Sequence, residues 1–147
     1  MDKLKVSTAN LVILVAGVVM LIASFLDFNK FKYASLHTSY TAWSSHFFLI
    51  ATIPALIGAV MGAHVAIEAF APGVRLPDRL LGLSWTQIHL VLGFQATIMM
   101  LAFLIQDTKP LDKGIGLYLM LLAAIALLVG AVLRMQEQPS GYTPPSL

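Results

Sequence analysis

The chain of 147 residues contains no cysteine. Disulfide-stapled loops, thiol catalysis and cysteine-ligated zinc or iron–sulfur sites are therefore excluded. Charge is also scarce, because Asp, Glu, Lys and Arg make up 11% of the residues, against about 25% in a soluble domain. No Walker loop, HExxH, GxSxG or dinucleotide-binding fingerprint occurs. These absences favour a non-enzymatic protein without excluding an enzyme.

Apolar residues are abundant instead, at 59% of the chain, and the mean hydropathy is +0.85. A helix that crosses about 30 Å of hydrocarbon needs roughly 17 to 25 predominantly apolar residues. Four segments approach this length, and short connections join them. The sequence therefore predicts an all-α, multi-pass membrane protein, a single domain over 1–147 folded as a four-helix up-down bundle, with helices at about 9–27, 46–71, 87–106 and 115–134.

The formal net charge is +2, and the nine Lys and Arg residues are scattered among the connections. Basic residues that flank membrane helices explain this pattern better than a nucleic-acid surface does. With both termini in the cytoplasm, that side carries only one basic residue more than the other, but it holds all three arginines, Arg75, Arg79 and Arg134. We therefore expect a protein of the cytoplasmic membrane with both termini cytoplasmic and no nucleic-acid partner.

The second predicted helix, 46–71, carries small residues on one narrow face. Among them, Gly58 and Gly62 form a GxxxG pair, which lets another helix approach closely in lipid. The sequence leaves open whether that helix belongs to the same chain or to another subunit. The complete packing face comprises Ala51, Ala55, Gly58, Gly62, Ala66 and Ala69.

Ionisable residues lie on the opposite face of the same helix. His64 and Glu68 are one helical turn apart, and His89 enters the third helix at a similar depth. Ionisable groups within a membrane span are costly, so they indicate a functional site by default. We predict an inner polar cluster of His64, Glu68 and His89.

Several interpretations of this cluster stay open. The favoured one is a hydrogen-bond network in which Glu68 pairs with Arg75, Arg79 or His64. Proton or cation handling is the next. No cofactor is expected, although two imidazoles and a carboxylate are also plausible metal ligands, and His64 with His89 could ligate a haem.

Three connecting or terminal segments complete the chain. The outer loop 27–45 is rich in aromatic residues, which suit either an interfacial belt or a small domain that contacts a partner. The segment 72–87 is predicted to lie along the inner interface with Trp85 as its anchor. The tail 136–147 is rich in Pro and Ser. The candidate partner contacts in the outer loop are Phe31, Tyr33, Tyr40 and Trp43.

The whole pattern resembles a group of uncharacterised small four-helix integral membrane proteins of high-GC Gram-positive bacteria. The resemblance rests on VAGVVMLIASFLDF, TAWSS, LSWTQIHLVLG and GIGLYLMLLAAIALLVGAVLRMQEQ, and it covers most of the chain. Members of that group have a Pro-Trp pair where this chain has Leu26 and Asp27, so the outer loop is expected to differ. The resemblance implies the fold but supplies no activity and no site residues.

These observations favour a non-enzymatic membrane subunit or scaffold of a larger assembly. Its small-residue helix faces and the 27–45 loop would bind other membrane subunits or a second copy of the chain. The alternative is a small proton- or cation-coupled transporter or channel component that uses His64, Glu68 and His89.

Overall fold

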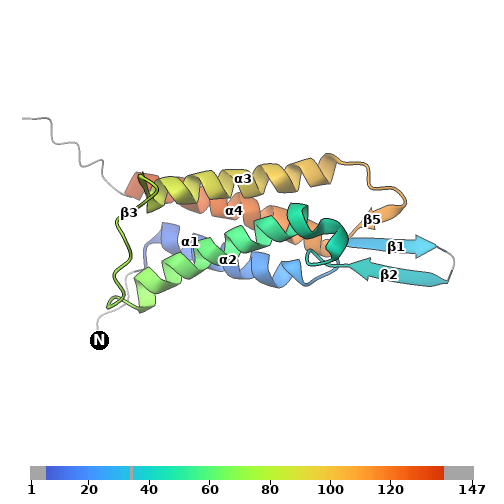
Figure 1. Cartoon of the computed structure of the whole chain (residues 1–147), viewed down its shortest axis with the longest axis horizontal. Helices are drawn as coiled ribbons and strands as arrows, with labels where there is room; N and C mark the ends of the chain where they lie inside the picture. Colours follow the sequence, from blue (N-terminus) through green and yellow to red (C-terminus); the bar gives the residue numbers. More distant parts are fainter. Residues whose placement is uncertain (1–5, 34, 138–147) are drawn as a thin grey trace, which may run out of the picture.

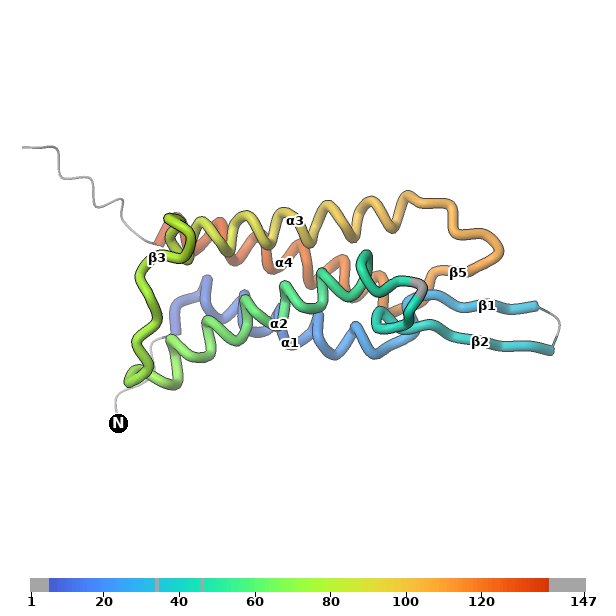
Figure 2. The backbone as a smooth tube through the Cα atoms, in the orientation of Figure 1, coloured from blue at the N-terminus to red at the C-terminus, as the bar shows by residue number. Residues whose placement is uncertain are grey.

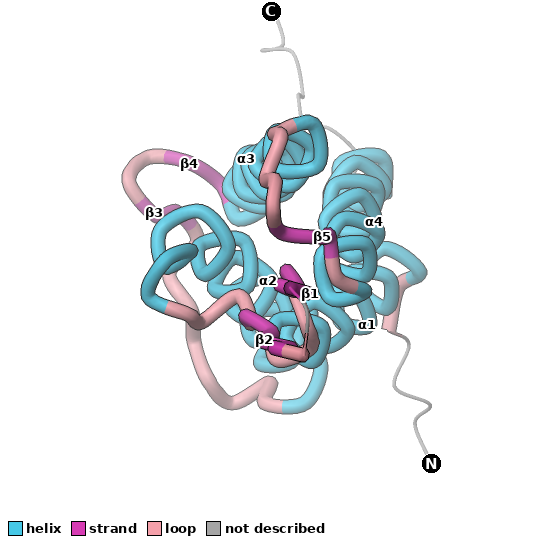
Figure 3. The backbone as a smooth tube through the Cα atoms, turned by 90° about the vertical axis from the view of Figure 1, so that its right-hand side faces the viewer, coloured by secondary structure: helices cyan, strands magenta, loops and turns pink. Residues whose placement is uncertain are grey.

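A computed structural model describes residues 6–33 and 35–137 and shows a mostly helical chain (Figure 1). Helices α1 and α2 are joined by a hairpin, and the end-on view shows the helices arranged in a ring in the order α1, α2, α3, α4 (Figure 3). Neighbouring helices run in opposite directions. The helices are α1 Thr8–Ser24, α2 Phe48–Phe70, α3 Trp85–Ile105 and α4 Ile115–Glu137.

Three of these helices, α2, α3 and α4, are long and apolar enough to cross a membrane. Helix α1 has 17 residues and ends at Ser24, short of the expected 27. If the helix continued, Phe28 N would donate to the Ser24 carbonyl. Instead Ala42 N donates to the Ser24 carbonyl over 3.1 Å, and Phe28 N donates to the Tyr40 carbonyl over 2.7 Å. The chain after Ser24 therefore turns into a sheet rather than continuing the helix.

Small residues bring α1 into close contact with both of its neighbours. A Cβ placed on Gly17 of α1 would lie 2.6 Å from the Gly58 carbonyl oxygen and 3.1 Å from Gly62 Cα. On its other side, α1 packs against Gly130 of α4 through Ile13. In the packing face predicted on α2, residues 51, 55, 58 and 62 are buried and residues 66 and 69 are half-buried. The GxxxG pair therefore serves a contact inside this chain.

Short strands, which the prediction of an all-α chain omitted, form at one end of the bundle. Strands β1 Asn29–Tyr33, β2 Leu36–Tyr40 and β5 Leu111–Lys113 make an antiparallel sheet in the order β2-β1-β5. Figure 2 shows the β1–β2 hairpin extending beyond the helices along the long axis of the bundle. We call this the sheet end, and the opposite end, where α1 begins and α4 finishes, the terminal end.

Aromatic side chains fasten the sheet to the helices. The fully buried Phe28 lies against Phe103 of α3, with ring centroids 4.8 Å apart, and against Phe47 at 5.8 Å. Beside the sheet, Lys30 Nζ lies 3.2 Å from Asp27 Oδ2, and hydrogen bonds from Ser39 and Lys30 hold the pKa of Asp27 below its usual range. The β1–β2 hairpin therefore emerges from a packed aromatic base, formed around Phe28, Phe47 and Phe103.

The four aromatic residues predicted to contact a partner divide into two pairs. Trp43 and Tyr40 belong to the base: Trp43 Nε1 donates to Ser24 Oγ over 2.9 Å, and Tyr40 meets Phe47 edge-on. Phe31 and Tyr33 stack on each other along β1, and Tyr33 is 71% exposed. The sheet therefore presents Tyr33, rather than Trp43, to the surroundings.

The segment between α2 and α3 forms a second, smaller hairpin at the terminal end, with strands β3 Arg79–Leu80 and β4 Leu83–Ser84. The predicted role of Trp85 as an interfacial anchor stays a prediction, and the structure adds where the residue lies. Trp85 starts α3, and its Nε1 donates to the Pro77 carbonyl over 2.7 Å. The indole therefore ties the connection to the bundle.

Leu81, at the tip of this hairpin, has φ 54° and is 95% exposed. A left-handed conformation costs a non-glycine residue about 1 to 2 kcal/mol, and glycine avoids most of that cost. We expect Leu81→Gly to raise the free energy of unfolding by about 1 kcal/mol. Thermal unfolding in detergent, followed by circular dichroism, measures the change. Leu83→Gly, within β4, is the matched control and is expected to lower stability instead.

Candidate functional site

Two buried histidines meet near the terminal end. His64 of α2 is 5% exposed and His89 of α3 is 1% exposed. Their rings lie edge to face, with centroids 4.9 Å apart and an interplanar angle of 87°. Trp85 stacks on His64 with centroids 3.9 Å apart. The two imidazoles are thus enclosed between α2 and the first turn of α3.

The start of α3 places Trp85 and His89 against α2. Ser84 caps the helix through a capping box: its Oγ accepts from Gln87 N, while Gln87 Oε1 accepts from Ser84 N. Trp85 and His89 are four residues apart, so both side chains lie on one face of the helix. A local capping signal therefore fixes the position of both rings.

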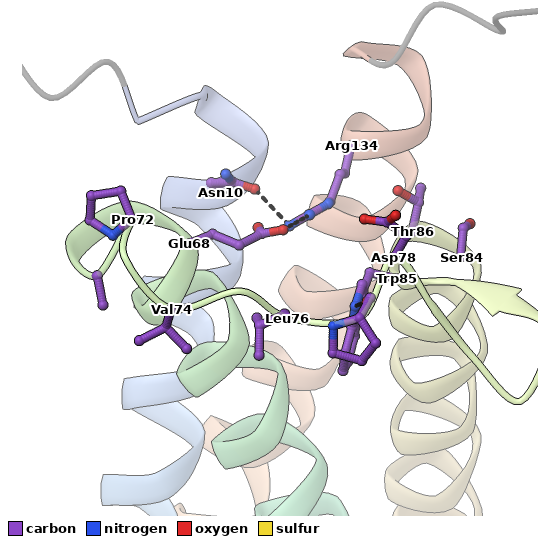
Figure 4. A pocket seen from close by; sticks show the side chains of 12 residues that line it. Asn10, Glu68, Pro72, Val74, Leu76, Asp78, Ser84, Trp85, Thr86 and Arg134 are labelled. Atoms are coloured by element: carbon purple, nitrogen blue, oxygen red, sulfur yellow. Dashed lines mark hydrogen bonds and ion pairs between the residues drawn. The ribbon is translucent and has the colours of Figure 1, made fainter.

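Glu68 joins the histidines to a buried arginine. Its Oε1 lies 3.7 Å from His64 Nε2. The same oxygen lies 2.7 Å from Arg134 Nη2 (Figure 4). The guanidinium also donates from Nη1 to Asn10 Oδ1 over 3.0 Å. Arg134 is 7% exposed, so its positive charge depends on these partners for compensation. The network connects α1, α2 and α4, and His64 extends it to α3.

The structure brings His64, Glu68 and His89 together, as the sequence predicted. Of the three predicted partners of Glu68, His64 lies within ion-pair distance. Arg75 and Arg79 are exposed on the connection, and Arg134 pairs with Glu68 in their place. Our prediction also omitted Asn10 and Arg134 from the cluster. The sequence did offer a clue to Arg134. It is the one Lys or Arg inside a predicted helix, and it lies between two apolar residues, which indicates a buried charge in need of a partner.

A cavity of about 800 Å³ opens beside this network at the terminal end. Figure 4 shows Glu68, Arg134 and Asn10 on one side, with the connection between α2 and α3 across the opening. The charged lining residues are Glu68, Asp78 and Arg134. Trp85 also lines the cavity and stacks on His64, so the indole lies between the opening and the imidazole.

Beyond the histidines, the described core is apolar for most of the bundle's length. It contains Met20, Met61, Met100 and Met120, all at most 1% exposed. The Thr97 hydroxyl lies 2.8 Å from the Gly93 carbonyl oxygen and 3.0 Å from that of Ala124. The hydrogen-bonding partners of this hydroxyl are therefore backbone groups of α3 and α4. Within residues 6–33 and 35–137, the polar groups therefore do not continue from His89 to the sheet end.

The geometry also bears on the haem and metal alternatives. Axial haem ligands lie on opposite faces of the macrocycle, whereas the His64 and His89 rings touch directly, with no gap for a porphyrin between them. In the part of the chain that the structure describes, no three His, Asp or Glu side chains are grouped closely enough to hold a metal ion. The arrangement instead suits a network that joins helices beside a polar opening.

Comparison of the chain with protein-family models, with curated proteins and with solved structures found no match. The function proposed for this chain therefore rests on its own residues and their geometry.

Proposed function

We propose that this chain is a non-enzymatic integral membrane subunit or scaffold that binds a partner of a larger assembly through its sheet end. In this proposal all four helices cross the cytoplasmic membrane, and the terminal end faces the cytoplasm. The exposed Phe25 and Leu26 extend the apolar surface of the short α1 toward the sheet end. The resemblance to small four-helix membrane proteins of high-GC Gram-positive bacteria is part of the same proposal.

The observation that carries the proposal is the free edge of β2. The order β2-β1-β5 leaves one side of β2 without a neighbouring strand in the described chain. Residues 36–39 of β2 are exposed, and the strand LHTSY contains no Asp, Glu, Lys, Arg or Pro. Edge strands are usually protected from pairing by charge, proline or shortness. The β2 edge has none of these protections.

The other edge of the same sheet provides a contrast. Strand β5 has three residues, includes Asp112 and Lys113, and follows Pro110. These features discourage the addition of a strand. The difference between the two edges supports β2 as the surface that receives a partner strand through backbone hydrogen bonds.

Apolar side chains at the hairpin tip would add contact area. Tyr33 and Leu36 are 71% and 67% exposed and face each other across the β1–β2 ladder. On α2, in contrast, the predicted small-residue face is largely used within the chain against α1. The sheet end therefore replaces that face as the proposed partner surface.

A charge placed on the β2 edge tests this proposal. We expect the variant Leu36→Lys/Thr38→Lys to reduce roughly tenfold the amount of partner that co-purifies with the tagged chain from gently solubilised native membranes. The matched control is Gln106→Lys combined with Asp107→Asn, two exposed positions where the net charge rises by the same two units at the same end but away from β2. That control should retain the partner. Equal recovery from the β2 variant and the unmodified chain would remove the sheet edge from the proposal.

The cavity beside Glu68 gives some support to the alternative of a proton- or cation-coupled transporter. It supplies an opening to the cluster of His64, Glu68 and His89, but the apolar core beyond His89 opposes a continuous path. Ion flux into liposomes that contain the purified chain, compared with a Glu68→Gln variant, distinguishes the two functions. A flux that disappears in the variant would favour transport over the scaffold.

A further inference from the structure

The outward face of α3 carries exposed residues at alternating intervals of four and three: Val91, Gln95, Ile98, Ala102 and Ile105. This spacing is that of the a and d positions of a heptad, along which two helices wind around each other. Helix α3 is also the least covered of the three long apolar helices. Within its apolar span 33% of the residues are buried, against 56% for α2 and 44% for α4.

Gln95 lies at the middle of this face. It is ten residues from either end of α3, Trp85 or Ile105, which is about 15 Å in each direction. A glutamine side chain at that depth does not reach the lipid headgroups. Among the residues of the four helices, all of them described, Gln95 is the one exposed polar side chain more than two turns from a helix end. An amide in hydrocarbon is stabilised by a hydrogen bond to another helix.

We propose that the occupant of this face is a second copy of the chain, packed α3 against α3 about a two-fold axis parallel to the helices. This inference rests on the proposal that α3 spans the bilayer. Two copies inserted in the same direction have parallel α3 helices, so each heptad position meets its own counterpart. The Gln95 amide offers both donors and an acceptor, and two facing copies can form reciprocal hydrogen bonds. Charged residues, which would repel their counterparts, are absent from the face.

The absence of native cysteine makes the contact directly measurable. In native membranes treated with copper phenanthroline, single-cysteine variants Ile98→Cys and Ala102→Cys are expected to form disulfide-linked dimers. The matched control is Leu122→Cys, which is 63% exposed on α4. It should give a several-fold lower yield of dimer. Equal yields from the two helices would overturn the assignment of the dimer to α3.

A second variant tests the role of the amide. Adding Gln95→Leu to the Ile98→Cys chain should reduce dimerisation about threefold to tenfold, because the helix keeps its apolar surface but loses the interhelical hydrogen bonds. Gln95→Asn should retain more of the dimer. An unchanged dimer with Gln95→Leu would contradict the inference. Partner recovery through the β2 edge is expected to survive Gln95→Leu, so failure of the dimer and failure of the scaffold function are distinguishable.

Discussion

Glu68→Ala is expected to lower the free energy of unfolding by about 2 kcal/mol, because it leaves the buried Arg134 guanidinium without its carboxylate. The loss is smaller than for a fully buried pair, since the Glu68 side chain is 32% exposed and water partly replaces it. For a chain of this size the change corresponds to a fall in melting temperature of about 4 to 8 °C. Thermal unfolding in detergent, followed by circular dichroism, measures the change in melting temperature.

Two further variants separate the pair from a general effect of charge. In Asp107→Ala the lost partner is Lys109, 3.9 Å away, and both side chains are mostly exposed, so we expect a change below about 0.5 kcal/mol. When Arg134→Met is combined with Glu68→Ala, the total loss should be less than the sum of the two single losses. Additive losses would mean that the ion pair does not join the helices as described.

Gly17→Ala is expected to be the second strongly destabilising change, by about 2 to 3 kcal/mol. The added Cβ would lie 2.6 Å from the Gly58 carbonyl oxygen, so the backbones of α1 and α2 would have to separate. Because both sides of the contact are helix backbone, no side chain can move to relieve it. The same thermal unfolding assay measures the loss.

Gly62→Ala is the informative control for this prediction. Gly62 belongs to the GxxxG pair that the sequence singles out, yet its added Cβ would come no closer than 3.6 Å to Gly17 Cα, an ordinary contact. We therefore expect Gly62→Ala to be neutral or slightly stabilising, since alanine favours helix. If Gly62→Ala is as damaging as Gly17→Ala, the approach of α1 to α2 differs from the one described.

The helices were predictable because apolar length is a strong signal, and α2, α3 and α4 all form close to the expected ranges. The end of α1 was not predictable from apolar length, because Leu26 and Phe28 extend the apolar run after the helix has stopped. That end is determined by two hydrogen bonds to residues distant in sequence, one from Ala42 to Ser24 and one from Phe28 to Tyr40. For the same reason the aromatic content of 27–45 did not reveal that part of this loop pairs with residues 111–113.

The candidate site shows a similar division. The closeness of His64 and Glu68 follows from helical spacing, and the approach of His89 from its depth. The partner of Glu68 depends on how α4 is placed beside α2, so sequence proximity misleadingly favoured Arg75 and Arg79 over Arg134. Trp85 was assigned to the interface because tryptophan commonly lies there. Its hydrogen bond to Pro77 and its stacking on His64 require the fold of the whole connection.

We propose that the chain works as a subunit with a partner at its sheet end. Native mass spectrometry of the tagged, full-length chain, released gently from its own membranes, tests this most directly. We expect a discrete species that contains a second protein bound to the chain in fixed ratio and that is lost in Leu36→Lys/Thr38→Lys. A mass equal to one or two copies of the chain, with no other protein bound, would contradict the claim.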